Sequence, residues 1–296
     1  MATQINNILC IGGGLLGLPV ARHFSKSQQV TLLKRSPIAT PLPISLCLAD
    51  IGDKSQLIEA LPTDIDIILY CLSPTEFSDA GYQKVFPEGV SNLLAALRHH
   101  KQVPKRIFFV SSTSVYSQND NELITEDSPA NPAAFSGMRL QEAETLLRNS
   151  GIPSTIVRFS GIYGGNRTRL IEQALRGDLS SQQEGPYTNR IHETDCIGVL
   201  LHLIQKEIDQ QSLHPLYLAS DCEPVPTHII AAWFREQLQC ETENTAINST
   251  KRRAGSKRCH NQRLLASGYR FIYPTWREGY GEMIQRLYAD KQQPKQ

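Results

Sequence analysis

The residues with the clearest chemical meaning are the glycines of the segment Gly12-Gly13-Gly14-Leu15-Leu16-Gly17. Their G-x-G-x-x-G spacing follows a short apolar run and opens a segment of helical period. In such a turn Gly12 permits the tight bend, Gly14 lets the backbone approach a pyrophosphate, and Gly17 lets helix and strand pack closely. The amide groups and positive dipole end of the helix attract phosphates. We therefore predict a dinucleotide site, with a purely structural glycine turn as the alternative. Its predicted contacts are Gly12, Gly14, Leu15, Leu16 and Gly17.

The end of the second apolar run favours NADP over NAD. Lys34 and Arg35 occur where an NAD-specific site carries an acid that holds the ribose hydroxyls. The planar fork of an arginine can instead pair with the 2′-phosphate of NADP. The alternatives are that both cations are solvated loop charges and that the cofactor is NAD. Asp50, after a third apolar run, is placed to meet the adenine, or else it caps a helix.

The elements that must position this turn follow from the periodicity. Short apolar strands alternate with segments of helical period, which predicts a parallel sheet covered on both faces. Right-handed crossovers make it doubly wound. The predicted strands are Ile8–Ile11, Val30–Leu33, Ile65–Cys71, Arg106–Ser111, Ser154–Arg158 and Leu216–Leu218. The predicted helices are Leu15–Phe24, Lys54–Ala60, Val90–His99, Leu140–Arg148, Thr194–Lys206 and Thr227–Leu238.

The pattern loosens after about residue 165, where polar stretches such as 180–186 and 240–256 read as loops. The predicted fold is α/β, a Rossmann-type doubly wound parallel sheet with a smaller C-terminal substrate lobe. Residues 1–165 form the NAD(P)-binding domain, to which 187–220 return. Residues 166–186 and 221–296 form the smaller lobe, for substrate or partner.

Composition narrows the classes of partner. The chain has 296 residues and a formal net charge of +1, so no global field draws it to nucleic acid or an anionic membrane. No apolar run reaches the roughly 18 residues of a membrane span, and the N-terminus does not read as a signal peptide. The 7 cysteines are scattered without a C-x-x-C pair, which is typical of a reducing compartment, so we expect a cytoplasmic protein. No His/Cys cluster has metal-ligand spacing, and no metal is expected.

Three further segments resemble a known family. These are Phe109–Tyr116, Arg158–Gly164 and Asn189–Asp195, together with an end segment, Leu264–Phe271. They are similar to the extended short-chain dehydrogenases/reductases, the NAD-dependent epimerase/dehydratase group. The glycine spacing, where that group commonly has G-x-x-G-x-x-G, indicates an atypical branch, and the end segment is similar to that of uncharacterised bacterial members of this branch. The resemblance implies a nicotinamide-dependent oxidoreductase, epimerase or dehydratase that acts on a polar, nucleotide-sugar-like substrate.

The resemblance also implies catalytic roles. Ser112 or Thr113 would hydrogen-bond a substrate oxygen beside the nicotinamide, unless the two only form a turn with side-chain-to-backbone bonds. The family's acid/base pair is Tyr-x-x-x-Lys, and here those positions are Phe135 and Arg139. Phe135 has no proton to give. Arg139 can still reach ribose hydroxyls, but it cannot act as a tunable base.

Two other residues are candidates for the missing chemistry. Tyr116 is the first candidate for a replacement acid, and its alternative is a packed tyrosine with a bonded hydroxyl. His192 could act catalytically or serve as a structural hydrogen-bonding group.

Two hypotheses about function follow. The first is an NADP(H)-dependent enzyme of the family type, and the second is a non-catalytic NADP(H)-binding sensor or scaffold. The basic segment Lys251–Arg258 could hold a substrate phosphate or be a solvated loop. We expect a small polar or phosphorylated substrate, no nucleic acid, no membrane, and a monomer or homodimer.

Overall fold

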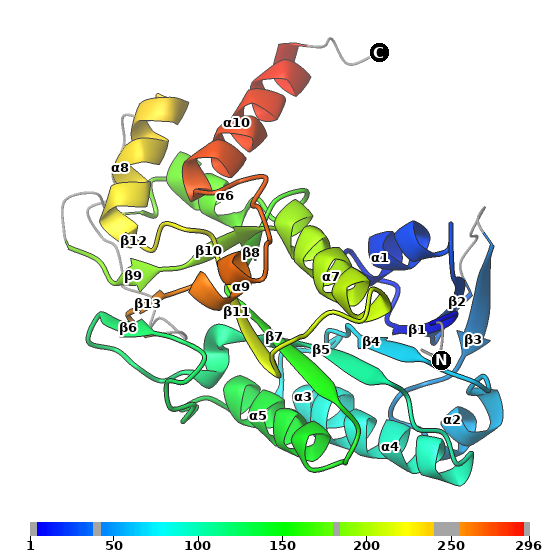
Figure 1. Cartoon of the computed structure of the whole chain (residues 1–296). Coiled ribbons are helices and arrows are strands. Elements are labelled where there is room, and N and C mark those ends of the chain that lie inside the picture. Colours follow the sequence, from blue (N-terminus) through cyan, green and yellow to red (C-terminus); the bar gives the residue numbers. More distant parts are fainter. Residues whose placement is uncertain (1–4, 38–42, 180–183, 240–254, 293–296) are drawn as a thin grey trace. The chain divides into compact units, whose positions relative to one another are not determined.

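Figure 1 shows the computed structural model of the chain, which describes residues 5–37, 43–179, 184–239 and 255–292. The chain divides into two compact units. The first comprises Met1–Tyr116, Pro129–Arg158 and Ile197–Tyr217, and the second comprises Ser117–Ser128, Phe159–Cys196 and Leu218–Gln296. The predicted lobes differ from these units chiefly because residues 117–128 and 187–196 belong to the second unit. Most of the two predicted polar loops, and residues 251–254 of the basic segment, lie outside the described ranges.

The first unit is built on a seven-stranded parallel sheet with strand order β11-β7-β5-β4-β1-β2-β3. The order confirms the predicted doubly wound sheet, because the chain winds outward from β1 in one direction and from β4 in the other. The point where β1 and β4 meet is therefore the topological switch, outside which open sheets bind their ligands. The strands are β1 (Asn7–Ile11), β2 (Gln29–Lys34), β3 (Ile44–Leu48), β4 (Ile67–Tyr70), β5 (Arg106–Ser112), β7 (Ser154–Phe159) and β11 (Leu216–Ala219).

Helices cover both faces of this sheet (Figure 1). One face carries α1 (Gly17–Phe24) and α7 (Glu193–Ile208), and the other carries α2 (Lys54–Ala60), α4 (Gly89–His99) and α5 (Phe135–Arg148). Helix α5 begins five residues before the predicted start at Leu140. Its N-cap is Ala134, whose side chain makes no capping hydrogen bond, so the sequence carries no start signal there. The short helix α3 (Asp79–Gln83) and the π-helical turn Lys84–Glu88 that follows it were not predicted.

The second unit consists of three two-stranded sheets and four helices of the described chain. The sheets pair β8 (Gly161–Tyr163) with β10 (Arg190–His192), β9 (Tyr187–Thr188) with β12 (Val225–Pro226), and β6 (Glu122–Ile124) with β13 (Lys257–Cys259). The helices are α6 (Arg169–Leu175), α8 (Thr227–Leu238), α9 (Gln262–Ala266) and α10 (Trp276–Gln292).

Helix α10 was missed because glycines interrupt its pattern, and the structure explains one of them. A Cβ on Gly279 would lie 2.2 Å from the hydroxyl of Tyr163. The ring of Tyr163 stacks on Tyr280 of the same helix with centroids 4.1 Å apart. Gly279 therefore lets α10 approach this buried tyrosine, which a helix-propensity argument cannot anticipate. Within the described ranges, no helix combines the length and apolarity needed to cross a membrane.

A buried charge cluster joins α5 to the sheet in the first unit. Glu144 has no exposed surface, and it accepts hydrogen bonds from Arg158 at 3.0 Å to one oxygen and 2.5 Å to the other. Ser111 donates to the same carboxylate at 2.7 Å, and Arg148 donates at 2.7 Å. Because both charges of the central pair are buried, loss of one partner leaves the other without compensation.

We predict that Glu144→Ala lowers the free energy of unfolding by about 3–5 kcal/mol, because Arg158 would remain buried without its counter-charge. Urea titration followed by circular dichroism measures the change. Glu142→Ala, on the exposed side of the same helix, should cost less than about 1 kcal/mol. A cost for Glu144→Ala no larger than that of this control would show that the buried pair does not hold α5 in place.

Candidate functional site

The glycine turn after β1 has the backbone geometry of a dinucleotide-binding turn. Gly12 has φ +104°, and a Cβ there would lie 2.2 Å from the carbonyl oxygen of Cys71. A Cβ on Gly17 would lie 2.0 Å from the carbonyl oxygen of Gly12. By contrast, a Cβ on Gly14 would meet no atom within 4 Å. Gly12 and Gly17 are thus required by the turn itself, whereas Gly14 faces open space, as close approach of a phosphate demands.

The start of α1 also fits a phosphate. Leu16 is the N-cap, and its side chain makes no capping hydrogen bond. Leu15 is exposed and Leu16 is buried. The helix begins two residues later than predicted because residues 12–16 form the turn. Its amino end carries the positive end of the helix dipole toward the carboxyl edge of the sheet, so these residues fit a pyrophosphate.

The charged residues that follow β2 and β3 lie at the same end of the sheet, where the parallel strands have their carboxyl ends. Lys34 ends β2 half-buried, and Arg35 beyond it is exposed. Asp50 accepts a hydrogen bond from the Gly52 amide at 2.9 Å and pairs with Lys84 at 2.9 Å. Burial works to raise the pKa of the Asp50 carboxyl, but these contacts and the charge of Arg35 outweigh it, so the pKa is lowered. Asp50 is therefore a charged carboxylate on the edge of the sheet where the prediction places the adenine.

The helix-cap alternative for Asp50 is wrong. Asp53 caps α2, accepting from the amides of Ser55 at 2.9 Å and Gln56 at 3.1 Å. The contact of Asp50 with adenine stays a prediction.

The turn after β5 brings Ser112 and Thr113 to the start of α5. Ser112 ends β5, and its hydroxyl accepts a hydrogen bond from the Ser114 amide at 3.1 Å. Thr113 begins the 3-10 turn Thr113–Val115. A Cβ on Gly137 of α5 would lie 2.4 Å from the carbonyl oxygen of Ser114, so the first turn of α5 packs directly against this segment. The side-chain-to-backbone bond of the turn alternative is present, and the Ser112 hydroxyl can still donate its own proton.

Phe135 and Arg139 both contact a segment that follows β4. The ring of Phe135 lies 5.1 Å from Phe77 and 5.5 Å from Tyr82, between centroids. Arg139 donates to both carboxylate oxygens of Asp79, from Nε at 2.8 Å and from Nη2 at 2.9 Å. The predicted reach of Arg139 to the nicotinamide ribose therefore competes with this bidentate pair.

A second carboxylate holds the same guanidinium. Nη1 of Arg139 donates to Glu142 at 2.9 Å and 3.0 Å. The hydrogen bond from Arg139 also lowers the pKa of the Asp79 carboxyl. Arg139 is consequently fixed between two charged acids on the surface of the first unit.

Tyr116 is buried rather than presented at the surface. The residue is 2% exposed, and the guanidinium carbon of Arg158 lies 4.8 Å from the ring centroid. This burial agrees with the alternative that Tyr116 is a packed core tyrosine. Tyr116 as a replacement acid stays a prediction.

His192 has a structural environment in the second unit. Its ring lies 5.2 Å from Tyr163 and 4.1 Å from Tyr273, between centroids. Its Nδ1 accepts a hydrogen bond from the Thr194 amide at 3.2 Å. Burial lowers the pKa of the imidazole. These contacts fit a structural hydrogen-bonding group, and a catalytic role for His192 stays a prediction.

No sequence motif marked the segment that contacts Phe135 and Arg139. Phe77, Asp79 and Tyr82 follow β4, one of the two strands at the topological switch. Any segment that leaves a switch-point strand at its carboxyl end lies beside the expected ligand. The position of this segment directly after β4 could therefore have marked it as part of the site.

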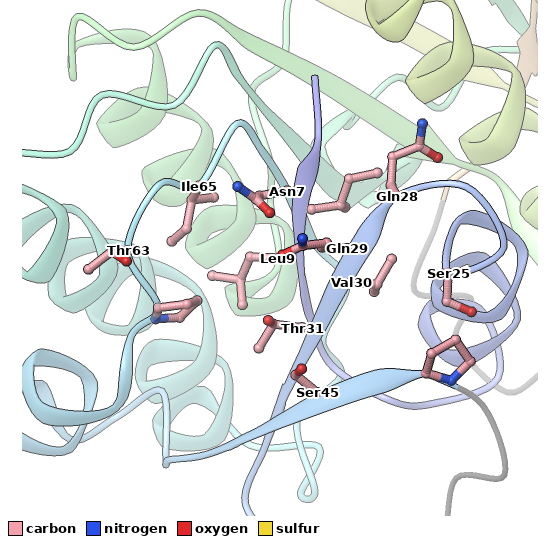
Figure 2. Close-up of a pocket in the computed structure, with 13 residues that line it drawn as sticks. Asn7, Leu9, Ser25, Gln28, Gln29, Val30, Thr31, Ser45, Thr63 and Ile65 are labelled. Atoms are coloured by element: carbon pink, nitrogen blue, oxygen red, sulfur yellow. The ribbon is translucent and has the colours of Figure 1, made fainter. Parts of the chain in front are cut away.

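Figure 2 shows a polar hollow at the other end of the sheet, where the strands have their amino ends. It has a volume of about 290 Å³ and lies where β1 and β2 begin, beside Asn7, Gln29 and Thr31. None of the 13 residues that line it is charged. Its position at the amino ends separates it from the glycine turn, so we do not assign it to the dinucleotide. The described residues also contain no cluster of His, Cys, Asp and Glu suited to a metal ion.

Comparison with known proteins agrees with the geometry of the turn. Residues 12–189 match the NAD(P)H-binding family. A structure from Methylobacillus flagellatus, described as an NAD-dependent epimerase/dehydratase, is 33% identical, covers 97% of this chain and 100% of its own, and has a TM-score of 0.77. The chain belongs to the NAD(P)H-binding epimerase/dehydratase family.

Two other family likenesses differ in strength. Protein YeeZ of Escherichia coli K12 is 29% identical over 217 residues, which are 68% of this chain and 74% of YeeZ. The UDP-glucose 4-epimerase of Thermotoga maritima, in a structure with UDP-glucose, is 15% identical with a TM-score of 0.77, covering 97% of this chain and 100% of its own. At that identity the likeness concerns the fold alone.

The glycine geometry predicts different effects for two substitutions. Gly14→Ala should leave the thermal midpoint near that of the wild type, because its Cβ enters open space, but should weaken NADPH binding roughly ten- to hundredfold by obstructing the phosphate. Gly17→Ala should lower the free energy of unfolding by about 1–3 kcal/mol, because its Cβ meets a backbone carbonyl. Differential scanning fluorimetry measures the thermal midpoints, urea titration gives the free energy of unfolding, and fluorescence titration gives the affinity for NADPH.

The matched control is Gly281→Ala in α10, where a Cβ also enters open space. It should leave NADPH binding unchanged. If Gly14→Ala bound NADPH as tightly as this control, the phosphate site would lie elsewhere.

Proposed function

We propose that the protein is an NADP(H)-dependent oxidoreductase, epimerase or dehydratase of the family type, with a non-standard active site. The observation that carries the proposal is the glycine turn, in which Gly12 and Gly17 are sterically required while Gly14 faces open space. The nicotinamide, when bound, donates or accepts the hydride. The amide groups at the start of α1 would hold the pyrophosphate, and Lys34 and Arg35 would hold the 2′-phosphate.

The substrate would carry a carbonyl or hydroxyl group on carbon. Ser112 and Thr113 stand at the carboxyl end of β5, where a hydroxyl can donate to an oxygen that develops negative charge. A nucleotide-sugar substrate is supported by the relatives, among them an epimerase described with UDP-glucose. The fold alone does not choose among reactions.

Phe135 sets a limit on the chemistry. General acid catalysis contributes about 10²–10⁴-fold, and the residue in the family's acid position cannot provide it. A proton must then come from another side chain, from water held by Ser112 and Thr113, or from the substrate. We expect slow turnover with ordinary ketones.

A non-catalytic NADP(H) sensor is the second candidate, and a specific observation favours it. Phe135 and Arg139, in the positions of the family's catalytic pair, both make structural contacts with the segment that follows β4. In a sensor this arrangement could couple cofactor binding to the position of that segment.

The cofactor preference is tested by titrating NADPH and NADH against intrinsic fluorescence. Because Lys34 and Arg35 replace the expected acid, NADPH should bind more tightly. Loss of one charge-assisted phosphate contact costs about 1.5–3 kcal/mol, so Arg35→Ala should weaken NADPH roughly ten- to hundredfold and leave NADH nearly unchanged. Arg98→Ala, at the end of α4, is the control. Equal affinity for both nucleotides would refute the NADP assignment.

The missing acid is tested by restoring it. Phe135→Tyr with Arg139→Lys rebuilds the family's pair on one face of α5, so NADPH oxidation with a panel of simple carbonyl compounds should rise by about 10²-fold or more. Phe135→Tyr alone, which keeps the Arg139–Asp79 pair, is the matched control and should gain less. If wild type and double variant were both inactive yet bound NADPH tightly, the sensor would be favoured.

A further inference from the structure

An exposed aromatic group adjoins the position of the missing acid. Phe77, Tyr82 and Phe135 form what we call the aromatic platform, in which each ring contacts the other two at centroid distances of 5.1–5.5 Å. Phe77 is 52% exposed, while Tyr82 and Phe135 are half-buried. A phenylalanine that keeps about half of its surface in water while it contacts two other rings presents apolar aromatic surface to solvent.

The platform lies on the ligand-binding edge of the first unit. The chain that leaves β4 passes the glycine turn first, where a Cβ on Gly12 would lie 2.2 Å from the carbonyl oxygen of Cys71 and 2.9 Å from Leu72. It then reaches Phe77, beside the first turn of α5. Because β1 and β4 flank the topological switch, this segment runs along the crevice in which open sheets bind ligands.

The platform is held in a fixed position. Asp79 follows Phe77 by two residues, and Arg139 follows Phe135 by one helical turn. Asp79 and Arg139 form a bidentate ion pair. Ring contact and ion pair therefore join the same two segments at neighbouring points. A surface fixed before binding loses less conformational freedom when a ligand arrives.

The charged side chains around the platform disfavour the binding of anions. Glu76 is exposed beside Phe77, and the side chains of Asp79 and Glu142 are 53% and 46% exposed. One cation, Arg139, stands among these three acids, and it is already paired with two of them. A phosphate or carboxylate placed here would meet net negative charge, whereas a neutral or cationic group would not.

We propose that the aromatic platform binds a planar, uncharged or cationic aromatic group of the substrate, in place of an anionic group. This inference rests on the proposed function and names an aryl carbonyl compound, or the corresponding alcohol, as the substrate class in place of the nucleotide sugar that the relatives suggest. An aromatic group can pack on an exposed ring in an offset-stacked or edge-to-face arrangement.

The first experiment measures binding rather than turnover. Three ketones of one shape are compared by saturation-transfer NMR, with and without NADPH: acetophenone, cationic 4-(trimethylammonio)acetophenone and anionic 4-acetylbenzoate. The neutral and cationic compounds should bind about tenfold more tightly than the anion, and the difference should shrink with added salt. UDP-glucose should not compete with acetophenone in the absence of NADPH.

Variants locate the binding. Phe77→Ala should weaken acetophenone about tenfold, while Phe77→Tyr, which keeps the ring, should bind like the wild type. Val103→Ala, which removes a 75% exposed side chain just before β5, is the matched control for loss of exposed apolar surface. Glu76→Lys should reduce or reverse the preference against the anion without removing a ring, which keeps the test informative if Phe77→Ala unfolds.

Two results would overturn the platform: equal binding of acetophenone to Phe77→Ala and Val103→Ala, or tighter binding of the anion than of acetophenone to the wild type. NADPH affinity, measured on the same variants, should not change with Phe77→Ala. A failure of NADPH to bind the wild type would contradict the proposed function, whereas the ketone series without NADPH judges the platform by itself.

Discussion

The carbonyl of Gly12 and the α-carbon of Gly17 approach so closely that no side chain fits between them. This approach fixes the start of α1 against the end of β1 and so aims the helix at the topological switch. The same turn admits the chain leaving β4, because Gly12 also lacks the side chain that would meet Cys71. Two close backbone approaches of Gly12, to Gly17 and to Cys71, therefore set the dinucleotide turn and the segment beyond β4.

The segment beyond β4 then contacts the face of α5 that carries Phe135 and Arg139. In the family a tyrosine and a lysine on one face of this helix perform the chemistry, and here the same face joins α5 to Phe77 and Asp79. Exposed ion pairs contribute about 0–1 kcal/mol and aromatic pairs about 0.5–1.5 kcal/mol, so neither contact alone stabilises the fold greatly. Together they order a segment at the ligand edge, which serves an enzyme and a sensor equally well.

The second unit is organised around a different constraint. Asp195 is buried, and it accepts hydrogen bonds from the amides of Ile272 and Tyr273 and from the hydroxyl of Tyr269. A carboxylate with three donors ties the C-terminal segment to the start of α7. The acid in the Asn189–Asp195 segment, which carried part of the family resemblance, thus has a structural role.

The sequence by itself determined the parallel sheet, most helices and the glycine turn, because these depend on local periodicity and on backbone space that only glycine allows. Helices α2 and α8 have the predicted bounds. The tertiary structure alone decided the start of α5, the helix α10 and the partners of Phe135, Arg139 and Asp50. Those features rest on contacts between segments far apart in the chain, such as Asp79 with Arg139 and Gly279 with Tyr163. The residue types at positions 135 and 139 were enough to show that the family's catalytic pair is missing. Only the packing of α5 on the segment after β4 showed which contacts Phe135 and Arg139 make instead.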